Sequence, residues 1–212
     1  MLRHFIIIVH ILALQAIFLV EANAQSFEKG NFIINSGIKI SVYNINDQDS
    51  EDSDDDDAAS SYTIPIGLEY ATSNKIGLGI EIGICNYFTG EDTITGAIAK
   101  ANSFDVMLAG NFHWVRGTHV DLYSGLGLGI SAFKYKSNDV RNSQFKSTGT
   151  YFRVGIFNAR FFVSRAIAFD LHMGIPYMNF NNGRITDNLG SDYENPISFI
   201  GIDVGTGITF RF

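Results

Sequence analysis

The sequence predicts an all-β fold, an eight-stranded antiparallel up-and-down transmembrane β-barrel. Apolar residues alternate with small or polar residues along eight segments, the period of a strand with two unlike faces. The connections between these segments are alternately short and long, the pattern of up-and-down membrane barrels. After the N-terminal segment, no apolar run is long enough for a spanning helix, so membrane insertion must use strands.

The N-terminal segment has the pattern of an export signal. Arg3 precedes an apolar run from Phe5 to Val20, and Ala22-Asn23-Ala24 fits the small-x-small cleavage rule. We therefore expect a cleaved signal peptide at residues 1–24 and one barrel domain at residues 25–212. The alternative is an uncleaved anchor, which the shortness of the run disfavours.

Eight strands follow in order along the chain. Their clearest parts are 32–42, 62–70, 76–84, 104–114, 120–130, 152–156, 167–177 and 200–212. The phase of the sixth strand blurs at Asn158-Ala159-Arg160. Short turns are expected at 73–74, 116–118 and 164–165, and long polar loops near 45–61, 89–102, 136–149 and 181–196. Both chain ends then fall on the short-turn side, which is periplasmic in bacterial outer-membrane barrels.

The two faces of these strands differ in a way that favours lipid on the outside. One face is mostly glycine, serine, alanine and asparagine, which suits a narrow lumen. The other is continuously apolar, whereas a soluble barrel would expose its polar face to water. Aromatic girdles are expected at both membrane edges. Their members would be Tyr70, Trp114, Phe162, Phe210 and Phe212 on the turn side, and Tyr62, Phe104, Phe152, Tyr177 and Phe199 on the loop side.

Two segments carry a family resemblance. The glycine-alternating segment 123–131 resembles a strand of the small bacterial outer-membrane β-barrel family, the OmpA-domain and OmpX-like group that includes Bacteroidota-type barrel domains. The C-terminal segment 208–212 resembles that group's insertion signal, with Phe210 and Phe212 at alternating apolar positions. The resemblance covers everything after Ala24 and implies recognition by the outer-membrane assembly machinery. We further expect a monomer in contact with outer-membrane lipids and lipopolysaccharide.

Composition excludes some functions. The formal net charge is -7, and much of it lies between Asp47 and Asp57, a stretch without a base, so no nucleic-acid partner is expected. The single cysteine, Cys85, has no disulfide partner and no metal-ligand spacing around it, and we expect it to be buried. No cofactor is predicted.

An enzymatic role is the least favoured interpretation. Some barrels of this size modify lipids with a histidine, a serine and an acid, and the candidates here are His113, His119 and His172 with Asp121 or Asp170. No serine next to these histidines stands out as a nucleophile. We therefore expect a non-enzymatic protein that displays four extracellular loops. The alternatives are a narrow porin-like pore for small solutes or ions and, behind it, a lipid A-modifying enzyme.

The acidic loop offers weak candidates for divalent-cation ligands. They are Asp49, Glu51, Asp52, Asp54, Asp55, Asp56 and Asp57. The run lacks the glycine and terminal glutamate of an EF-hand loop, so a solvated loop is the default interpretation. In the second long loop, Asp92-Thr93-Ile94 resembles a Bacteroidota O-glycosylation motif with Thr93 as acceptor.

Strand phase sends charged side chains into the lumen. They are Lys39, Arg153 and Arg211, together with Glu69, Glu81, Asp105, Asp121, Asp170 and Asp203. Enclosed charges are costly unless they are paired or hydrated. Estimated heights in the barrel predict the pairs Lys39–Asp203 and Arg211–Asp170, and a lumen plugged by such pairs argues against a wide channel.

Overall fold

The computed structural model describes residues 26–47, 57–88, 99–137, 143–186, 192–194 and 196–212. Eight long strands build it: β1 (Phe32–Asp47), β2 (Asp57–Ala71), β3 (Ile76–Phe88), β4 (Ala99–Arg116), β5 (Val120–Ser137), β6 (Gln144–Phe162), β7 (Ile167–Phe180) and β10 (Ile197–Arg211). Two short strands, β8 (Arg184–Thr186) and β9 (Asp192–Glu194), extend the sheet beyond β6. In the described part of the chain, no helix is long and apolar enough to cross a membrane.

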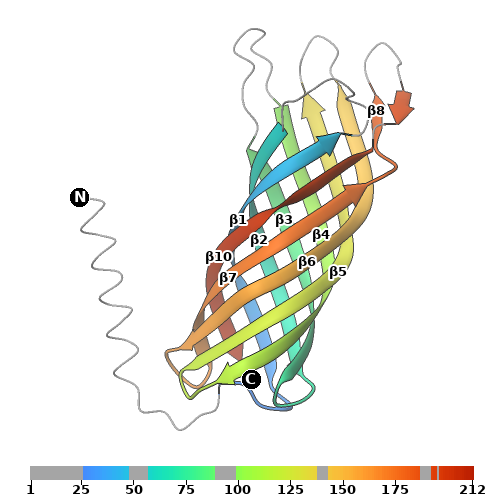
Figure 1. Cartoon of the computed structure of the whole chain (residues 1–212). Helices are drawn as coiled ribbons and strands as arrows, with labels where there is room; N and C mark the ends of the chain where they lie inside the picture. Colours follow the sequence, from blue (N-terminus) through green and yellow to red (C-terminus); the bar gives the residue numbers. More distant parts are fainter. Residues whose placement is uncertain (1–25, 48–56, 89–98, 138–142, 187–191, 195) are drawn as a thin grey trace, which may run out of the picture.

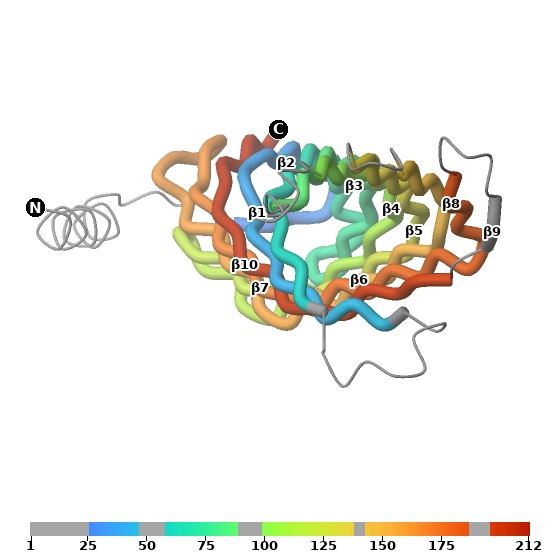
Figure 2. The backbone as a smooth tube through the Cα atoms, turned by 90° about the horizontal axis from the view of Figure 1, so that it is seen from above, coloured from blue at the N-terminus to red at the C-terminus, as the bar shows by residue number. Residues whose placement is uncertain are grey.

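The eight long strands close into an antiparallel barrel. Each pairs with the next along the chain, β10 takes its place after β7, and the pairing of β10 with β1 completes the ring. The strands are strongly tilted, and the C-terminus lies at the end of the barrel that carries the short turns (Figure 1). Viewed from above, β8 lies at one side of the ring, next to β6 (Figure 2). The predicted fold class is therefore confirmed.

The strands reach further than the sequence pattern indicated. They contain 13 to 19 residues, whereas about 9–11 residues suffice to cross a membrane. β1 continues to Asp47 and β2 begins at Asp57, so both ends of the predicted 45–61 loop are strand. The predicted 181–196 loop likewise contains β8 and β9. Strands extend into polar sequence because the ladder bonds are made by the backbone.

Several sequence predictions fall outside the described residues. These are the signal peptide at 1–24, the candidate cation ligands at 49–56 and the motif at 92–94. Asp57, the last of the cation candidates, begins β2. These predictions therefore stay predictions.

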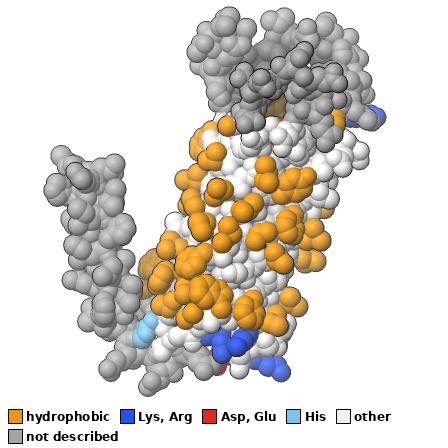
Figure 3. All heavy atoms as spheres, viewed as in Figure 1, with side chains coloured by type: hydrophobic (Ala, Val, Ile, Leu, Met, Phe, Trp, Pro, Cys, Tyr) orange, Lys and Arg blue, Asp and Glu red, His pale blue; other side chains and the backbone are white. Residues whose placement is uncertain are grey.

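The outer surface of the barrel is apolar, as expected if it faces lipid. Many isoleucine, leucine and phenylalanine side chains are exposed, and hydrophobic side chains are spread along the whole described height of the face shown in Figure 3. Two of the predicted girdle residues are wrong, because Phe162 and Phe199 are 5% and 3% exposed and face the interior. Phe199 directly precedes the outward-facing Ile200, so the alternation itself turns it inward. Phe162 is displaced in phase by an irregularity earlier in β6.

That irregularity explains the blurred phase of the sixth strand. The register between β6 and β7 shifts between Gly155 and Phe157, which is the signature of a β-bulge. Two successive residues, Ile156 and Phe157, are therefore both exposed on the outer face. After the bulge the inward positions are shifted by one residue, which brings Arg160 to the interior.

Candidate functional site

Arg160 lies at the centre of a buried charge cluster near the short-turn end of the barrel. Its guanidinium nitrogens lie 2.6 Å from Glu69 Oε2, 3.3 Å from Asp121 Oδ2 and 3.7 Å from Asp170 Oδ1. The guanidinium carbon also lies 4.3 Å from the centre of the Tyr123 ring, a cation–π contact. These side chains come from β2, β5, β6 and β7, so one cation links four strands across the lumen.

His113 belongs to the same cluster. Its Nδ1 lies 2.8 Å from Asp121 Oδ1, and its Nε2 lies 3.1 Å from Glu69 Oε1. The imidazole is stacked between the rings of Phe27 and Tyr123, with centroid separations of 3.5 and 4.9 Å. Because both nitrogens face carboxylates, neither is positioned to activate a serine. Phe27 precedes β1 and is fully buried, so the chain segment leading into the barrel covers its lower end.

A second charge cluster lies further up the lumen. Lys39 Nζ is 2.6 Å from Glu81 Oε1, joining β1 to β3. Arg153 donates two hydrogen bonds to the Asp203 carboxylate, from Nε at 2.7 Å and from Nη2 at 2.6 Å, joining β6 to β10. The second pair has the bidentate geometry that gives strong, directional ion pairs.

The two predicted ion pairs are wrong. Lys39 pairs with Glu81 rather than Asp203, although Lys39 and Asp203 lie close together on paired strands. The Lys39 stem lies against Gly205, where a Cβ atom would be only 2.8 Å from Lys39 Cγ, and this glycine leaves the lysine free to reach across the lumen. Asp203 is then satisfied by Arg153.

Arg211 and Asp170 also have other partners. Asp170 accepts a hydrogen bond from Thr209 and faces Arg160. The Arg211 guanidinium lies 4.9 Å from the centre of the Phe162 ring and donates to the Arg165 carbonyl at the rim. Arg211 therefore lies too near the short-turn edge to join the interior network.

Sequence reasoning missed the central member, Arg160. Strand phase did identify Glu69, Asp121 and Asp170 as inward-facing, and all three are at most 4% exposed. The signal for Arg160 was the break in alternation around Ile156, which marks the bulge.

The remaining chemistry-bearing candidates are scattered. His172 Nδ1 lies 3.2 Å from Asn158 Oδ1 on the neighbouring strand. His119 lies in the turn before β5, where strand phase does not apply. Cys85 is buried, as predicted. The structure thus brings only His113 of the three histidines to a carboxylate cluster.

The upper lumen is filled by aromatic rings. The buried members of this cluster are Tyr43, Cys85, Tyr87, Ala101, Phe133, Phe145, Met178, Phe180 and Phe199. Phe133 is its hub, with ring centroids of Tyr87, Phe180 and Phe199 all within 5.5 Å. The interior is therefore apolar at the loop end and charged below.

The spaces between these clusters are small. A cavity of about 50 Å³ is lined by residues that include Glu69, Glu81, Arg153 and His172. A second cavity, of about 10 Å³, lies beside Lys39 and Asp203. Such volumes hold single waters or a few of them, hydrogen-bonded to the polar walls.

Comparison with known proteins agrees with this architecture. The family model described as "Outer membrane protein beta-barrel domain" matches residues 11–210. Among solved structures, OprG from Pseudomonas aeruginosa is 12% identical, with a TM-score of 0.57 over 90% of this chain and 99% of that one. A major outer membrane protein from Thermus thermophilus is 9% identical, with a TM-score of 0.55 over 85% and 99%. Neisserial surface protein A is 11% identical, with a TM-score of 0.52 over 87% and 100%. No curated protein matches the sequence.

Proposed function

Because the chain belongs to the outer membrane protein β-barrel domain family, we propose that it is a non-enzymatic scaffold of the bacterial outer membrane with a sealed lumen. In this proposal the barrel holds the four long connections at the cell surface, where they interact with external partners. The observation that carries it is the buried cluster around Arg160, in which one guanidinium faces three carboxylates and side chains from four strands fill the lumen.

The sealed lumen distinguishes this proposal from a pore. A solute passing through would have to displace the aromatic cluster at Phe133, then the Arg153–Asp203 pair, then the cluster at Arg160. Separating a buried ion pair leaves its charges without compensation, and this costs about 3–5 kcal/mol for each broken pair. A barrel of eight strands has room for little more than its own side chains.

We propose that the protein has no catalytic activity, because the surroundings of His113 leave its side chain no access to a substrate. Both of its nitrogens are engaged by carboxylates and both of its faces are covered by rings. A general base must instead reach the proton that it removes. Mass spectrometry of lipid A from cells with and without the protein tests this point, and a protein-dependent change in acylation would contradict it.

We propose the orientation of the barrel in the membrane from the position of its short turns and of its C-terminus. The turns at 72–75, 117–119 and 163–166 lie at the end of the barrel that also carries Phe212 (Figure 1). Outer-membrane barrels keep their short turns in the periplasm. An epitope inserted between residues 138 and 142 should bind antibody on intact cells, whereas one inserted at Ser164 should bind only after permeabilisation. The reverse pattern would overturn the orientation.

Conductance in planar bilayers tests the sealed lumen. The folded wild-type protein should give no stable single-channel steps under conditions in which a wide porin conducts. The double variant Arg153→Ala, Asp203→Ala removes one barrier. Stable steps from this variant, absent from the wild type, would show that the Arg153–Asp203 pair is one of the barriers in the lumen. Steady ion conductance by the wild type would favour the narrow pore instead.

A further inference from the structure

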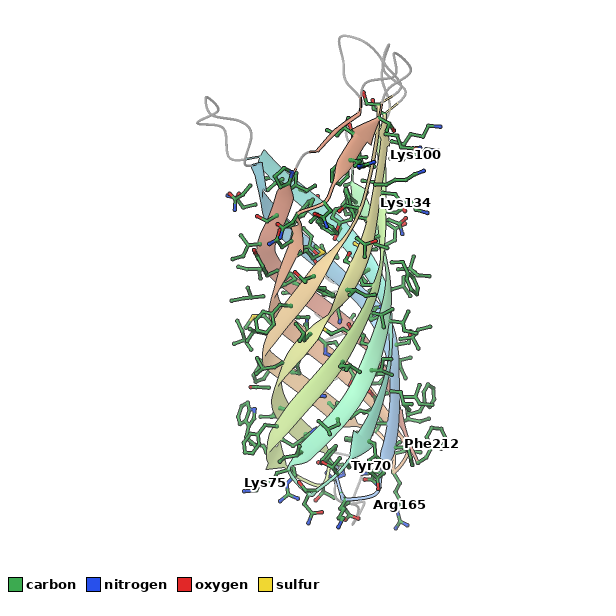
Figure 4. All side chains as sticks on the ribbon, turned by 90° about the vertical axis from the view of Figure 1, so that its right-hand side faces the viewer. Tyr70, Lys75, Lys100, Lys134, Arg165 and Phe212 are labelled. Atoms are coloured by element: carbon green, nitrogen blue, oxygen red, sulfur yellow. The ribbon has the colours of Figure 1, made fainter. Side chains whose placement is uncertain are left out.

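Four lysines project outward from the loop-side ends of three adjacent strands. They are Lys100 on β4, Lys134 and Lys136 on β5, and Lys146 on β6, and all four are exposed. Figure 4 shows Lys100 and Lys134 pointing away from the barrel near its upper end. We refer to these four residues as the lysine row.

Strand register sets these cations directly against one another. Lys100 is paired with Lys136 across β4 and β5, and Lys134 is paired with Lys146 across β5 and β6. Arg184 of β8 lies opposite Lys146 on the far side, and Glu194 of β9 lies opposite Arg184 in turn. Like charges in directly opposed positions destabilise a sheet. No salt bridge between described residues involves the lysine row, and a bound anion would relieve the repulsion between the opposed lysines.

The charge is confined to one part of the circumference. On the described parts of the other barrel strands, outward positions near the loop-side ends are Asn46, Ala58, Asn86, Asn179 and Ser198. None of these side chains is charged. The lysine row is therefore a discrete patch and not a general collar of solubilising residues.

The lysine row lies just above the apolar belt on the same outer face. Phe104 and Ile130, four residues along β4 and β5 from Lys100 and Lys134, are 50% and 57% exposed. Four residues of strand span about 13 Å. Between them lie small or polar side chains, among them Asn102 and Ala132. A ligand with acyl chains below and an anionic head above would match both zones.

We propose that the lysine row binds the phosphates of lipid A, the bisphosphorylated and acylated glycolipid of the outer leaflet. Its phosphates would bridge opposed lysines, and its acyl chains would lie against Phe104, Ile130 and Phe152. Lysine binds phosphate as a compact point charge, so four of them suit a headgroup with two phosphates. This proposal rests on the orientation given above, in which the loop end is the outer-leaflet end.

Native mass spectrometry of the full chain folded in detergent tests the proposal. The probes are purified bisphosphorylated lipid A, its monophosphorylated form and phosphatidylglycerol, each at equal concentration. The variant is Lys100→Gln, Lys134→Gln, Lys136→Gln and Lys146→Gln. Its matched control removes four cations near the turn end, by Lys29→Gln, Lys75→Gln, Arg116→Gln and Arg165→Gln, and Figure 4 shows Lys75 and Arg165 there.

The wild type and the control should retain bisphosphorylated lipid A. Both should retain the monophosphorylated form more weakly. The lysine-row variant should retain at least ~10-fold less, since each basic residue near an anionic lipid surface contributes about fivefold. Equal retention by the variant, or equal retention of phosphatidylglycerol by the wild type, would overturn the proposal. If the fourfold variant does not fold, the pairs Lys100→Gln with Lys136→Gln and Lys134→Gln with Lys146→Gln replace it. The orientation assay is separate, so an inverted barrel that still binds lipid A would refute the orientation and not the site.

Discussion

The backbones of Phe32 and Phe212 exchange two hydrogen bonds, from Phe32 N to Phe212 O at 3.1 Å and from Phe212 N to Phe32 O at 2.8 Å. The last residue of the chain thus pairs with the first residue of β1 and completes the seam between β1 and β10. Its side chain points outward and is 73% exposed, beside the lower rim (Figure 4). One residue therefore combines a backbone role in closure with a ring available for recognition.

We predict that deleting Phe212 impairs both roles. Loss of two hydrogen bonds should destabilise the barrel by about 1–3 kcal/mol, and loss of the terminal ring should slow assembly. Phe212→Ala keeps the backbone bonds and removes only the ring, so it separates the two effects. The measurement is the heat-modifiable fraction in outer-membrane and periplasmic extracts. Normal assembly of both variants would show that the C-terminal phenylalanine is not an assembly signal.

Replacing Arg160 should be strongly destabilising. Arg160→Met leaves Glu69, Asp121 and Asp170 without their shared cation, and breaking such a buried pair costs about 3–5 kcal/mol. The measurement is the free energy of unfolding by urea in lipid vesicles. Arg165→Met, at an exposed turn position, is the control and should change stability by less than about 0.5 kcal/mol. Equal effects of the two substitutions would contradict a central role for Arg160.

A double-mutant cycle should locate the true partner of Lys39. The pair Lys39→Met and Glu81→Gln should show a coupling energy of at least about 1 kcal/mol, because the two charges are in direct contact. The pair Lys39→Met and Asp203→Asn should couple more weakly, since Asp203 is held by Arg153. Stronger coupling to Asp203 would mean that the two ion pairs exchange partners in the folded protein.

Removing the acidic segment should leave the barrel folded. Replacement of residues 49–56 by a short glycine-serine connection keeps the β1–β2 pairing, which reaches Ile45 opposite Asp57. Shortening a loop changes its closure entropy only slightly. The heat-modifiable band and the urea midpoint should match those of the wild type within about 1 kcal/mol. A variant that does not fold in detergent would show that this segment is structural.

The sequence by itself determined the architecture, because the pattern that specifies each strand lies within a short stretch of sequence. The two-residue alternation around Ile82, Leu128 and Ile202 identifies the strands and their apolar face. The even number of strands and the alternating loop lengths then fix an up-and-down barrel. The inward direction of Lys39 and Asp203 follows from the same phase. The reach of the strands was underestimated, since backbone pairing continues into polar sequence, and Phe162 and Phe199 were placed on the wrong face.

Tertiary structure decided which side chains meet. Partnerships across the lumen depend on the register and stagger of strands far apart in the sequence, and a single bulge after Gly155 changes the face of every later residue in β6. That bulge brought Arg160 to Glu69, a contact between residues 91 positions apart. Register also aligned Lys100 with Lys136 and Lys134 with Lys146 on the outside. Alternation tells each residue which side of the wall it faces, but its neighbours are set by how the strands slide past one another as the barrel closes.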